Sequence, residues 1–170
     1  MVLTLRPYRE SDAETIVSWL ADEHAFALWS AGRYENWPLS AEGMNTRMAE
    51  DAEGSVTALT MTDGVTVLGH LLMRFPNEEK DEIRLFSIIV DSRQRGRGLG
   101  RSLLRLAETY AFDTLSVKRI TISVFEENAP ARTCYDRLGY TVIGADTPAV
   151  CLGRSYARLL VEKRKVQEQS

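Results

Sequence analysis

The sequence has few cysteines and no long apolar run. Cys134 and Cys151 are the only cysteines among its 170 residues. Two are too few for a disulfide framework or a cysteine-based zinc site, and they fit a reducing cytoplasm. No apolar stretch approaches the roughly 18 residues that a membrane span needs, and residues 1–10 lack the apolar core of a secretory signal. These absences predict a cytoplasmic protein that contains no metal site and does not enter a membrane.

The sequence also lacks an excess of positive charge. It has 21 basic against 24 acidic residues, a formal net charge of −3 at pH 7. Nucleic-acid-binding domains usually show a basic excess, so we predict no nucleic-acid partner. The content of 44% hydrophobic and 26% charged residues is ordinary for a globular chain and excludes disorder as the overall state. The length predicts one domain over residues 1–162, with a polar tail at 163–170 that frays.

Periodic patterns divide the chain into strands and helices. Alternating or continuous apolar runs predict strands at 2–6, 55–61, 65–74, 82–90, 118–125 and 155–162. Helical spacing predicts helices after Ser11, after Ser40, at about 98–114 and at about 128–138. Asp63-Gly64 is a strong hairpin signal between two of the strands. The strand–helix–strand–helix order from 82 to 138 favours an α/β or α+β sheet.

The densest chemical signal lies between the strand at 82–90 and the helix after it. There the chain reads Val90-Asp-Ser-Arg-Gln-Arg-Gly-Arg-Gly-Leu-Gly-Arg101. Glycines let the backbone approach a ligand closely, and amides that lead into a helix N-terminus converge on an anion. The arginines at 93, 95, 97 and 101 stand against Asp91 alone. The loop is therefore predicted to bind phosphate groups.

Two common phosphate-binding motifs do not fit this loop. A P-loop needs Lys and Ser or Thr after its last glycine, and Gly100 is followed by Arg101. A dinucleotide fingerprint needs G-x-G-x-x-G, and here the third glycine comes one residue early. A short disordered RNA-binding Arg-Gly segment is a further alternative, but apolar periodic elements flank the loop on both sides.

Arg95-x-x-Gly98-x-Gly100 resembles the pyrophosphate loop of the GNAT superfamily of N-acetyltransferases. Asn128-x-x-Ala131-x-x-x-Tyr135-x-x-x-Gly139-Tyr140 resembles the superfamily's second signature. The resemblance covers about residues 82–140. It implies a mixed, mostly antiparallel central sheet with a splayed strand pair, flanked by about four helices. It also implies acetyl-CoA as cofactor, with CoA as product, and transfer of the acetyl group to a primary amine of a small molecule or peptide by direct attack.

The resemblance further implies which residues contact the cofactor. They are Ile88, Ile89 and Val90 on the splayed strand, Arg95, Gly96, Arg97, Gly98, Leu99, Gly100 and Arg101 in the loop, and Asn128 and Tyr135 beyond it. A backbone amide near Ile88 to Val90 is a candidate donor to the developing oxyanion. Tyr135 is the candidate donor to the departing thiolate. Its alternative is an ordinary core aromatic residue.

The amine needs a base, because only its neutral form attacks. Glu82 is a candidate base through a water molecule, and its alternative is a solvated residue in the acidic run 78–82. His70 is the rival, although a lone histidine is more often structural.

The acceptor is predicted to contact the segment before the hairpin. Trp29, Tyr34 and Trp37, together with His70, are the candidate acceptor-binding residues. Aromatic rings beside carboxylates suit a cationic amine; alternatively, these rings pack helices onto the sheet. A non-catalytic acyl-CoA-binding sensor is the alternative function, and both a monomer and a homodimer remain open.

Overall fold

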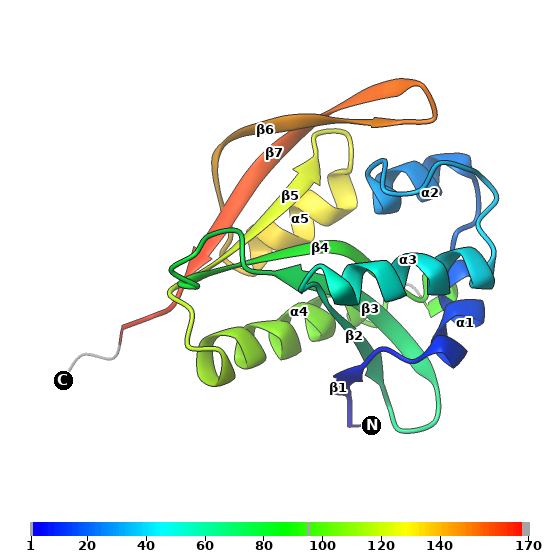
Figure 1. Cartoon of the computed structure of the whole chain (residues 1–170). Helices are drawn as coiled ribbons and strands as arrows, with labels where there is room; N and C mark the ends of the chain where they lie inside the picture. The colour runs from blue at the N-terminus through cyan, green and yellow to red at the C-terminus, as the bar shows by residue number, and fades with distance from the viewer. Residues whose placement is uncertain (1, 95, 168–170) are drawn as a thin grey trace.

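Seven strands form a single mixed sheet in the part of the chain that the structure describes, residues 2–94 and 96–167 of a computed structural model (Figure 1). The strand order is β1-β2-β3-β4-β5-β7-β6. Only β4 and β5 run parallel among these neighbours. The strands are β1 Thr4–Pro7, β2 Thr57–Thr62, β3 Val67–Arg74, β4 Glu82–Val90, β5 Arg119–Phe125, β6 Thr141–Cys151 and β7 Arg154–Arg164. This confirms the predicted mixed, mostly antiparallel sheet.

Five α-helices accompany the sheet within the described residues. They are α1 Ala13–Val17, α2 Glu23–Ser30, α3 Ala41–Glu53, α4 Leu99–Thr109 and α5 Ala129–Arg137. Asp22 caps α2 by accepting a hydrogen bond from the amide of Ala25, and Ser40 caps α3 in the same way from Gly43. The cap predicted at Ser11 was wrong, because Glu10–Asp12 forms a 3-10 turn before α1. Asp12 in that turn is buried and bonds Arg6 and Thr60.

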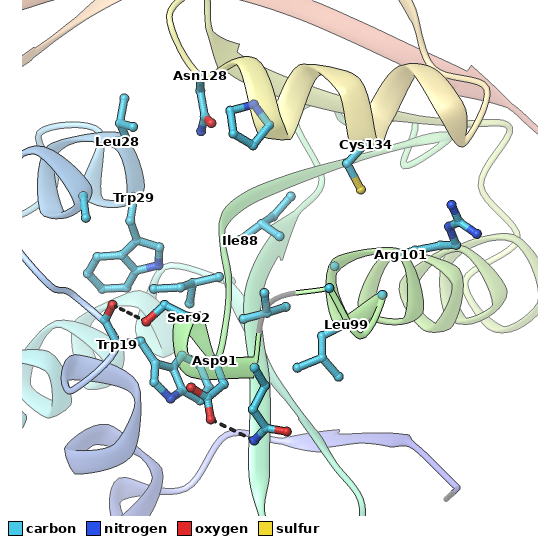
Figure 2. A pocket seen from close by; sticks show the side chains of 18 of the residues that line it. Trp19, Leu28, Trp29, Ile88, Asp91, Ser92, Leu99, Arg101, Asn128 and Cys134 are labelled. Atoms are coloured by element: carbon cyan, nitrogen blue, oxygen red, sulfur yellow. Dashed lines mark hydrogen bonds between the residues drawn. The ribbon is translucent and has the colours of Figure 1, made fainter.

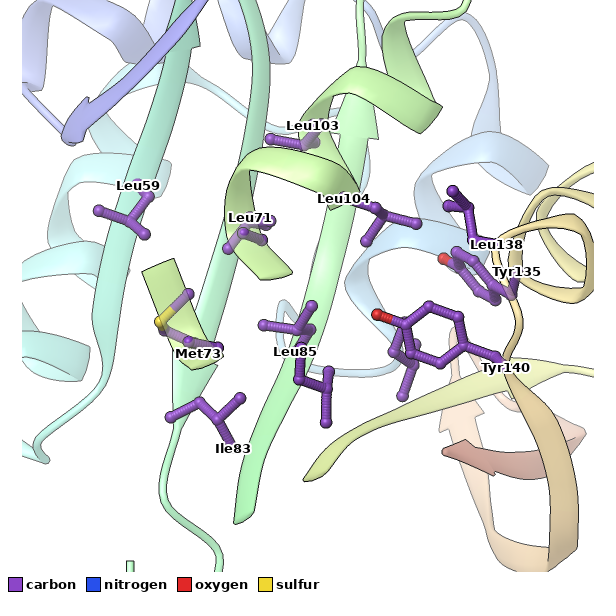
Figure 3. Packing of buried hydrophobic residues seen from close by; sticks show 14 of the residues in the cluster. Leu59, Leu71, Met73, Ile83, Leu85, Leu103, Leu104, Tyr135, Leu138 and Tyr140 are labelled. Atoms are coloured by element: carbon purple, nitrogen blue, oxygen red, sulfur yellow. The ribbon is translucent and has the colours of Figure 1, made fainter. Parts of the chain in front are cut away.

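The helices cover both faces of the sheet. On one face α4 and α5 pack Leu103, Leu104 and Tyr135 against strand residues that include Leu85 (Figure 3). On the other face α1, α2 and α3 pack a second cluster, which includes Trp19, Phe26 and Met44, against Leu72. Burial of these side chains stabilises the fold by roughly 1.5–3 kcal/mol for each large apolar residue.

The parallel pair β4 and β5 is joined over only part of its length. Pairing begins with Glu82 opposite Arg119 and ends with Leu85 opposite Ile122. Both strands continue beyond this point, to Val90 and to Phe125, without pairing to each other. The two strands therefore splay apart at their carboxyl ends, as the sequence resemblance implied.

The strand β6 was missed at the sequence level. Most of its residues are exposed, and Gly144, Asp146 and Pro148 interrupt any alternation. Its pairing partner β7 extends to Arg164, so Lys163 and Arg164 belong to a strand and not to the predicted tail. None of the described helices is both long and apolar enough to cross a membrane.

Candidate active site

The glycine-rich segment after β4 forms a tight loop that opens helix α4. Gly96 and Gly98 have φ values of 80° and 69°, in the left-handed region that favours glycine. The first intrahelical bond of α4 runs from the amide of Ser102 to the carbonyl of Gly98. The amides of residues 99–101 therefore have no partner within the helix and can donate hydrogen bonds to a ligand, as at any helix N-terminus.

Asp91 lies at the start of this loop and hydrogen-bonds the residues that follow it. It is buried and accepts hydrogen bonds of 3.0 and 3.1 Å from the backbone and side chain of Arg93, and one of 3.1 Å from Gln94. Burial raises the pKa of Asp91, but these hydrogen bonds and the Arg93 charge outweigh it, so the pKa lies below its usual range. Asp91 therefore stays ionised and fixes the loop backbone.

A pocket of about 540 Å³ lies beside the loop (Figure 2). We call it the loop pocket. Its lining combines the end of β4, the loop, the start of α4, the segment after α1, and residues from α2 and α5. These residues include Trp19, Leu28, Trp29, Ile88, Ile89, Val90, Asp91, Gly96, Gly98, Leu99, Gly100, Arg101, Asn128, Thr133, Cys134 and Arg137. The lining combines glycine backbone, Arg101 and Arg137 with apolar side chains, which suits a ligand that has both phosphates and an apolar arm.

A second pocket of about 360 Å³ lies where β4 and β5 diverge. We call it the splay pocket. Its lining includes Arg33, Arg74, Arg84, Phe86, Ser87, Ser123, Phe125, Tyr135, Asp146, Thr147 and Arg158. Four residues line both pockets, namely Leu28, Trp29, Ile88 and Asn128. The two pockets therefore meet at these four residues.

A β-bulge in β4 shapes this meeting point. His70 pairs with Ile89 and Leu72 pairs with Phe86, so β4 has one residue more than β3 between these pairs. Ser87 lies in the bulge with φ of 49°, and its carbonyl accepts a 3.0 Å hydrogen bond from the indole of Trp29. The bulge and this bond redirect the end of β4 and attach α2 to it.

Tyr135 lines the splay pocket from α5. It is not among the residues that line the loop pocket. Burial raises its pKa above the usual value of a phenol, so the hydroxyl stays protonated near neutral pH. The hydroxyl forms no hydrogen bond with other described residues and is available to a ligand. Asn128 caps α5 by accepting a 3.4 Å bond from Ala131.

Most of the predicted cofactor residues lie together. Nine of them line the loop pocket, namely Ile88, Ile89, Val90, Gly96, Gly98, Leu99, Gly100, Arg101 and Asn128. Arg97 does not line it and hydrogen-bonds the side chain of Gln94. Arg95 lies outside the described residues.

The candidate base Glu82 lines neither pocket. It is buried and bonds Arg119 at 2.5 Å, Thr121 at 2.6 Å and Arg84 at 3.3 Å. His70 also lines neither pocket, and burial lowers its pKa to about 4. Neither residue is placed where it would contact an acceptor, so the geometry does not favour the predicted base.

Of the predicted acceptor residues, only Trp29 lines a pocket. Tyr34 is buried and stacks on Trp29 with ring centroids 5.4 Å apart, and Trp37 packs on Phe26. The arginines of the splay pocket were missed, because Arg33, Arg74, Arg84 and Arg158 come from four separate segments. No local pattern links them, because the sheet positions Arg74, Arg84 and Arg158 and the segment after α2 positions Arg33.

The comparisons with known proteins agree with this geometry. The model of the acetyltransferase (GNAT) family matches residues 13–140. This chain belongs to that family. L-amino acid N-acetyltransferase AaaT of Escherichia coli is 30% identical over 121 residues, which cover 71% of this chain and 70% of that protein. The chain is thus an acetyl-CoA-dependent acyltransferase, and the predicted family and cofactor are confirmed.

Solved acetyltransferases share the fold. Spermidine N-acetyltransferase from Vibrio cholerae, in complex with CoA and spermine, has a TM-score of 0.76 at 19% identity and covers 95% of both chains. The acetyltransferase yncA from Salmonella typhimurium, with its cofactor acetyl-CoA, has a TM-score of 0.68 at 17% identity. It covers 100% of this chain and 98% of its own. The loop pocket fits this cofactor, because its lining combines the N-terminus of α4 and two arginines with apolar side chains.

Proposed function

We propose that this acetyltransferase moves the acetyl group of acetyl-CoA to the primary amine of a small molecule held in the splay pocket. The observation that carries the proposal is that the two pockets meet at Leu28, Trp29, Ile88 and Asn128. A ligand in the loop pocket can place its reactive end at this junction, within reach of a second ligand in the splay pocket. Because both reactants are held close together, the acetyl group can pass directly from one to the other. A volume of about 360 Å³ suits a small acceptor.

Each part of the site has a proposed role. Bound acetyl-CoA supplies an activated acyl group. The loop amides and Arg101 hold its phosphates. A backbone amide in β4 near Ile88 stabilises negative charge as it develops on the acyl oxygen. Tyr135, still protonated, donates to the departing sulfur.

Asp146 is proposed to hold the acceptor's ammonium group before the proton leaves. It is the one carboxylate among the described residues that line the splay pocket. Burial raises its pKa, but hydrogen bonds and the nearby charges of Arg158 and Arg84 lower it more, so the group stays ionised. An ionised carboxylate attracts an ammonium group and orients it, while water takes the proton.

Two acceptor classes appear among the relatives. AaaT is named for L-amino acids, whereas the Vibrio cholerae structure contains spermine.

We propose that the chain acts in the cytoplasm, which fits its two free cysteines.

The test is a transfer assay with a broad panel of amines. The protein is incubated with acetyl-CoA and each amine, and both free thiol and the mass of the product are measured. We expect one amine class to give equal amounts of CoA and N-acetylated product. Tight acetyl-CoA binding with no transfer to amines, peptides or aminoglycosides would instead indicate a sensor.

A further inference from the structure

We propose that the acceptor carries an oxyanion, such as a carboxylate, as well as its amine, and that the arginines of the splay pocket bind the oxyanion. This inference rests on the proposed function, since it assigns the acceptor to the same pocket. It names the substrate class as small amino acids and related zwitterions, and it excludes polyamines.

The lining of the splay pocket carries an excess of positive charge. Four arginines line the splay pocket, namely Arg33, Arg74, Arg84 and Arg158. Asp146 is the only carboxylate among the described lining residues. A pocket with this excess of positive charge attracts an anionic group and repels a polycation. None of the acidic residues at 22–35 or 78–82 lines this pocket.

Arg74 has no counterion among the residues that the structure describes. Arg33 bonds Asp51 at 2.5 Å, Arg84 bonds Glu82 at 3.3 Å, and Arg158 lies 3.9 Å from Asp146. Arg74 forms no ion pair or side-chain hydrogen bond with the described residues. Arg74 is itself exposed, and no described carboxylate offsets its charge.

The sheet register places two of these arginines opposite each other. Arg74 on β3 is directly opposite Arg84 on β4. Residues directly opposite lie on the same face with Cβ atoms about 4.5–5.5 Å apart, and like charges in this arrangement repel. An oxyanion bound between the two guanidinium groups would remove the repulsion and accept hydrogen bonds from both.

Polar atoms of the lining are also buried without a partner among the described residues, and Arg33 and Ser87 each carry one of them. Nη1 of Arg33 and Oγ of Ser87 have no hydrogen-bond partner among the described residues. Ser87 is only 8% exposed, and the Arg33 guanidinium lies 5.0 Å from the centre of the Phe86 ring. Buried donors without partners are costly, and an oxygen-rich ligand would satisfy both.

The rest of the pocket suits the other parts of such a molecule. Asp146 supplies a partner for the ammonium, and Trp29, Phe86 and Phe125 supply apolar surface. The acceptor's two charges would then face opposite charges.

The experiment compares matched acceptors. The twenty L-amino acids and spermidine are assayed with acetyl-CoA, and the best amino acid is compared with its carboxamide and its decarboxylated amine. We expect at least about a tenfold higher kcat/KM for the amino acid, the ratio that one charged hydrogen bond supports. Equal or better transfer to the carboxamide or to spermidine would overturn the inference and leave the proposed function intact.

Variants then locate the oxyanion. Arg74→Gln should raise the KM for the amino acid at least about tenfold, with the KM for acetyl-CoA unchanged, and Arg74→Lys should restore part of the loss as a point charge. Arg105→Gln, an exposed arginine on α4 outside both pockets, is the control and should change neither KM. A rise in the acetyl-CoA KM in Arg74→Gln would assign Arg74 to the cofactor and contradict the inference.

A binding measurement separates the two proposals. With CoA present, the N-acetylated amino acid should raise the melting temperature more than its N-acetylated carboxamide does. This outcome without any turnover would overturn the proposed function alone. Equal shifts would overturn the inference alone.

Discussion

At the scale of single residues, Tyr135 is the candidate proton donor of the site. Tyr135 lies on α5, and its ring centroid is 6.1 Å from that of Tyr140. The residue also lines the splay pocket. Burial raises the pKa of the phenol and keeps it a proton donor. The sequence suggested Tyr135 as a donor to the departing thiolate, which stays a prediction, and grouped it with the cofactor residues, whereas it lines the splay pocket and not the loop pocket.

We predict that Tyr135→Phe lowers kcat about a hundredfold, the smaller end of what a positioned proton donor contributes. The dissociation constant for acetyl-CoA should stay within about twofold, because the residue does not line the loop pocket. Steady-state kinetics and calorimetry measure the two quantities. Tyr140→Phe is the control, since its hydroxyl bonds Glu108 away from both pockets. Unchanged turnover in Tyr135→Phe would remove Tyr135 from the mechanism.

At the scale of elements, the junction of β4, the loop and α4 forms the cofactor side of the site. The glycine positions and helix start were predictable because positive φ and a free helix N-terminus require local sequence features. The bulge at Ser87 was not, because serine rarely adopts φ of 49° and nothing in the local sequence signals it.

We predict that Gly98→Glu abolishes acetyl-CoA binding. A carboxylate would enter the loop pocket beside the phosphates, and φ of 69° adds roughly 1 kcal/mol of backbone strain. Calorimetry measures the binding. Gly153→Glu is the matched control, because Gly153 also has positive φ, of 80°, and open space around its Cβ but lies outside both pockets. Undiminished binding in Gly98→Glu would refute the assignment of the loop.

The bulge gives a second prediction at this scale. Ser87→Gly should keep the bulge and bind acetyl-CoA as before, since glycine adopts positive φ readily. Ser87→Val should unfold at lower denaturant concentration and lose turnover, because a β-branched side chain disfavours this conformation. Denaturant titration and initial rates test the pair. Equal stability and activity in the two variants would show that the bulge is not required.

At the scale of the whole molecule, the sheet was predictable in class but not in order. Strand signals at 82–90 and 118–125 were clear, and so was the helix that joins them. The edge strand β6 was missed because a solvent-exposed strand has little apolar alternation. The splay pocket could not be predicted, because its arginines meet through the pairing of β3 with β4, the position of β7 and the segment after α2.

The buried residue His70 on β3 makes the free energy of unfolding depend on pH. Burial lowers the pKa of His70 from an unfolded value of 6.5 to about 4. The unfolded chain therefore binds more protons between these values, and stability is complete above about pH 6.5 and falls as pH decreases towards 4. The free energy of unfolding should fall by on the order of 2–3 kcal/mol over this pH window.

We predict that His70→Leu flattens this dependence. Neither ring nitrogen of His70 has a hydrogen-bond partner among the described residues, so leucine removes no such bond. Urea titrations at pH 7, 6, 5 and 4.5 give the free energy of unfolding, and His70→Gln provides a second variant if the first folds poorly. The pKa of Asp12 is lowered from 3.8, so the stability that the protein loses when Asp12 is protonated is lost below this pH window. An unchanged slope in both variants would rule out His70 as the cause.

The central claim is that the loop pocket and the splay pocket form one reaction site, joined where β4 and β5 diverge. The most direct measurement is a crystal structure of the protein with acetyl-CoA bound. The account predicts the pyrophosphate against the amides of residues 98–101 and the acetyl group between Ile88 and Asn128, facing the splay pocket and Tyr135. An acetyl group that points away from the splay pocket, or a cofactor bound outside the loop pocket, would contradict it.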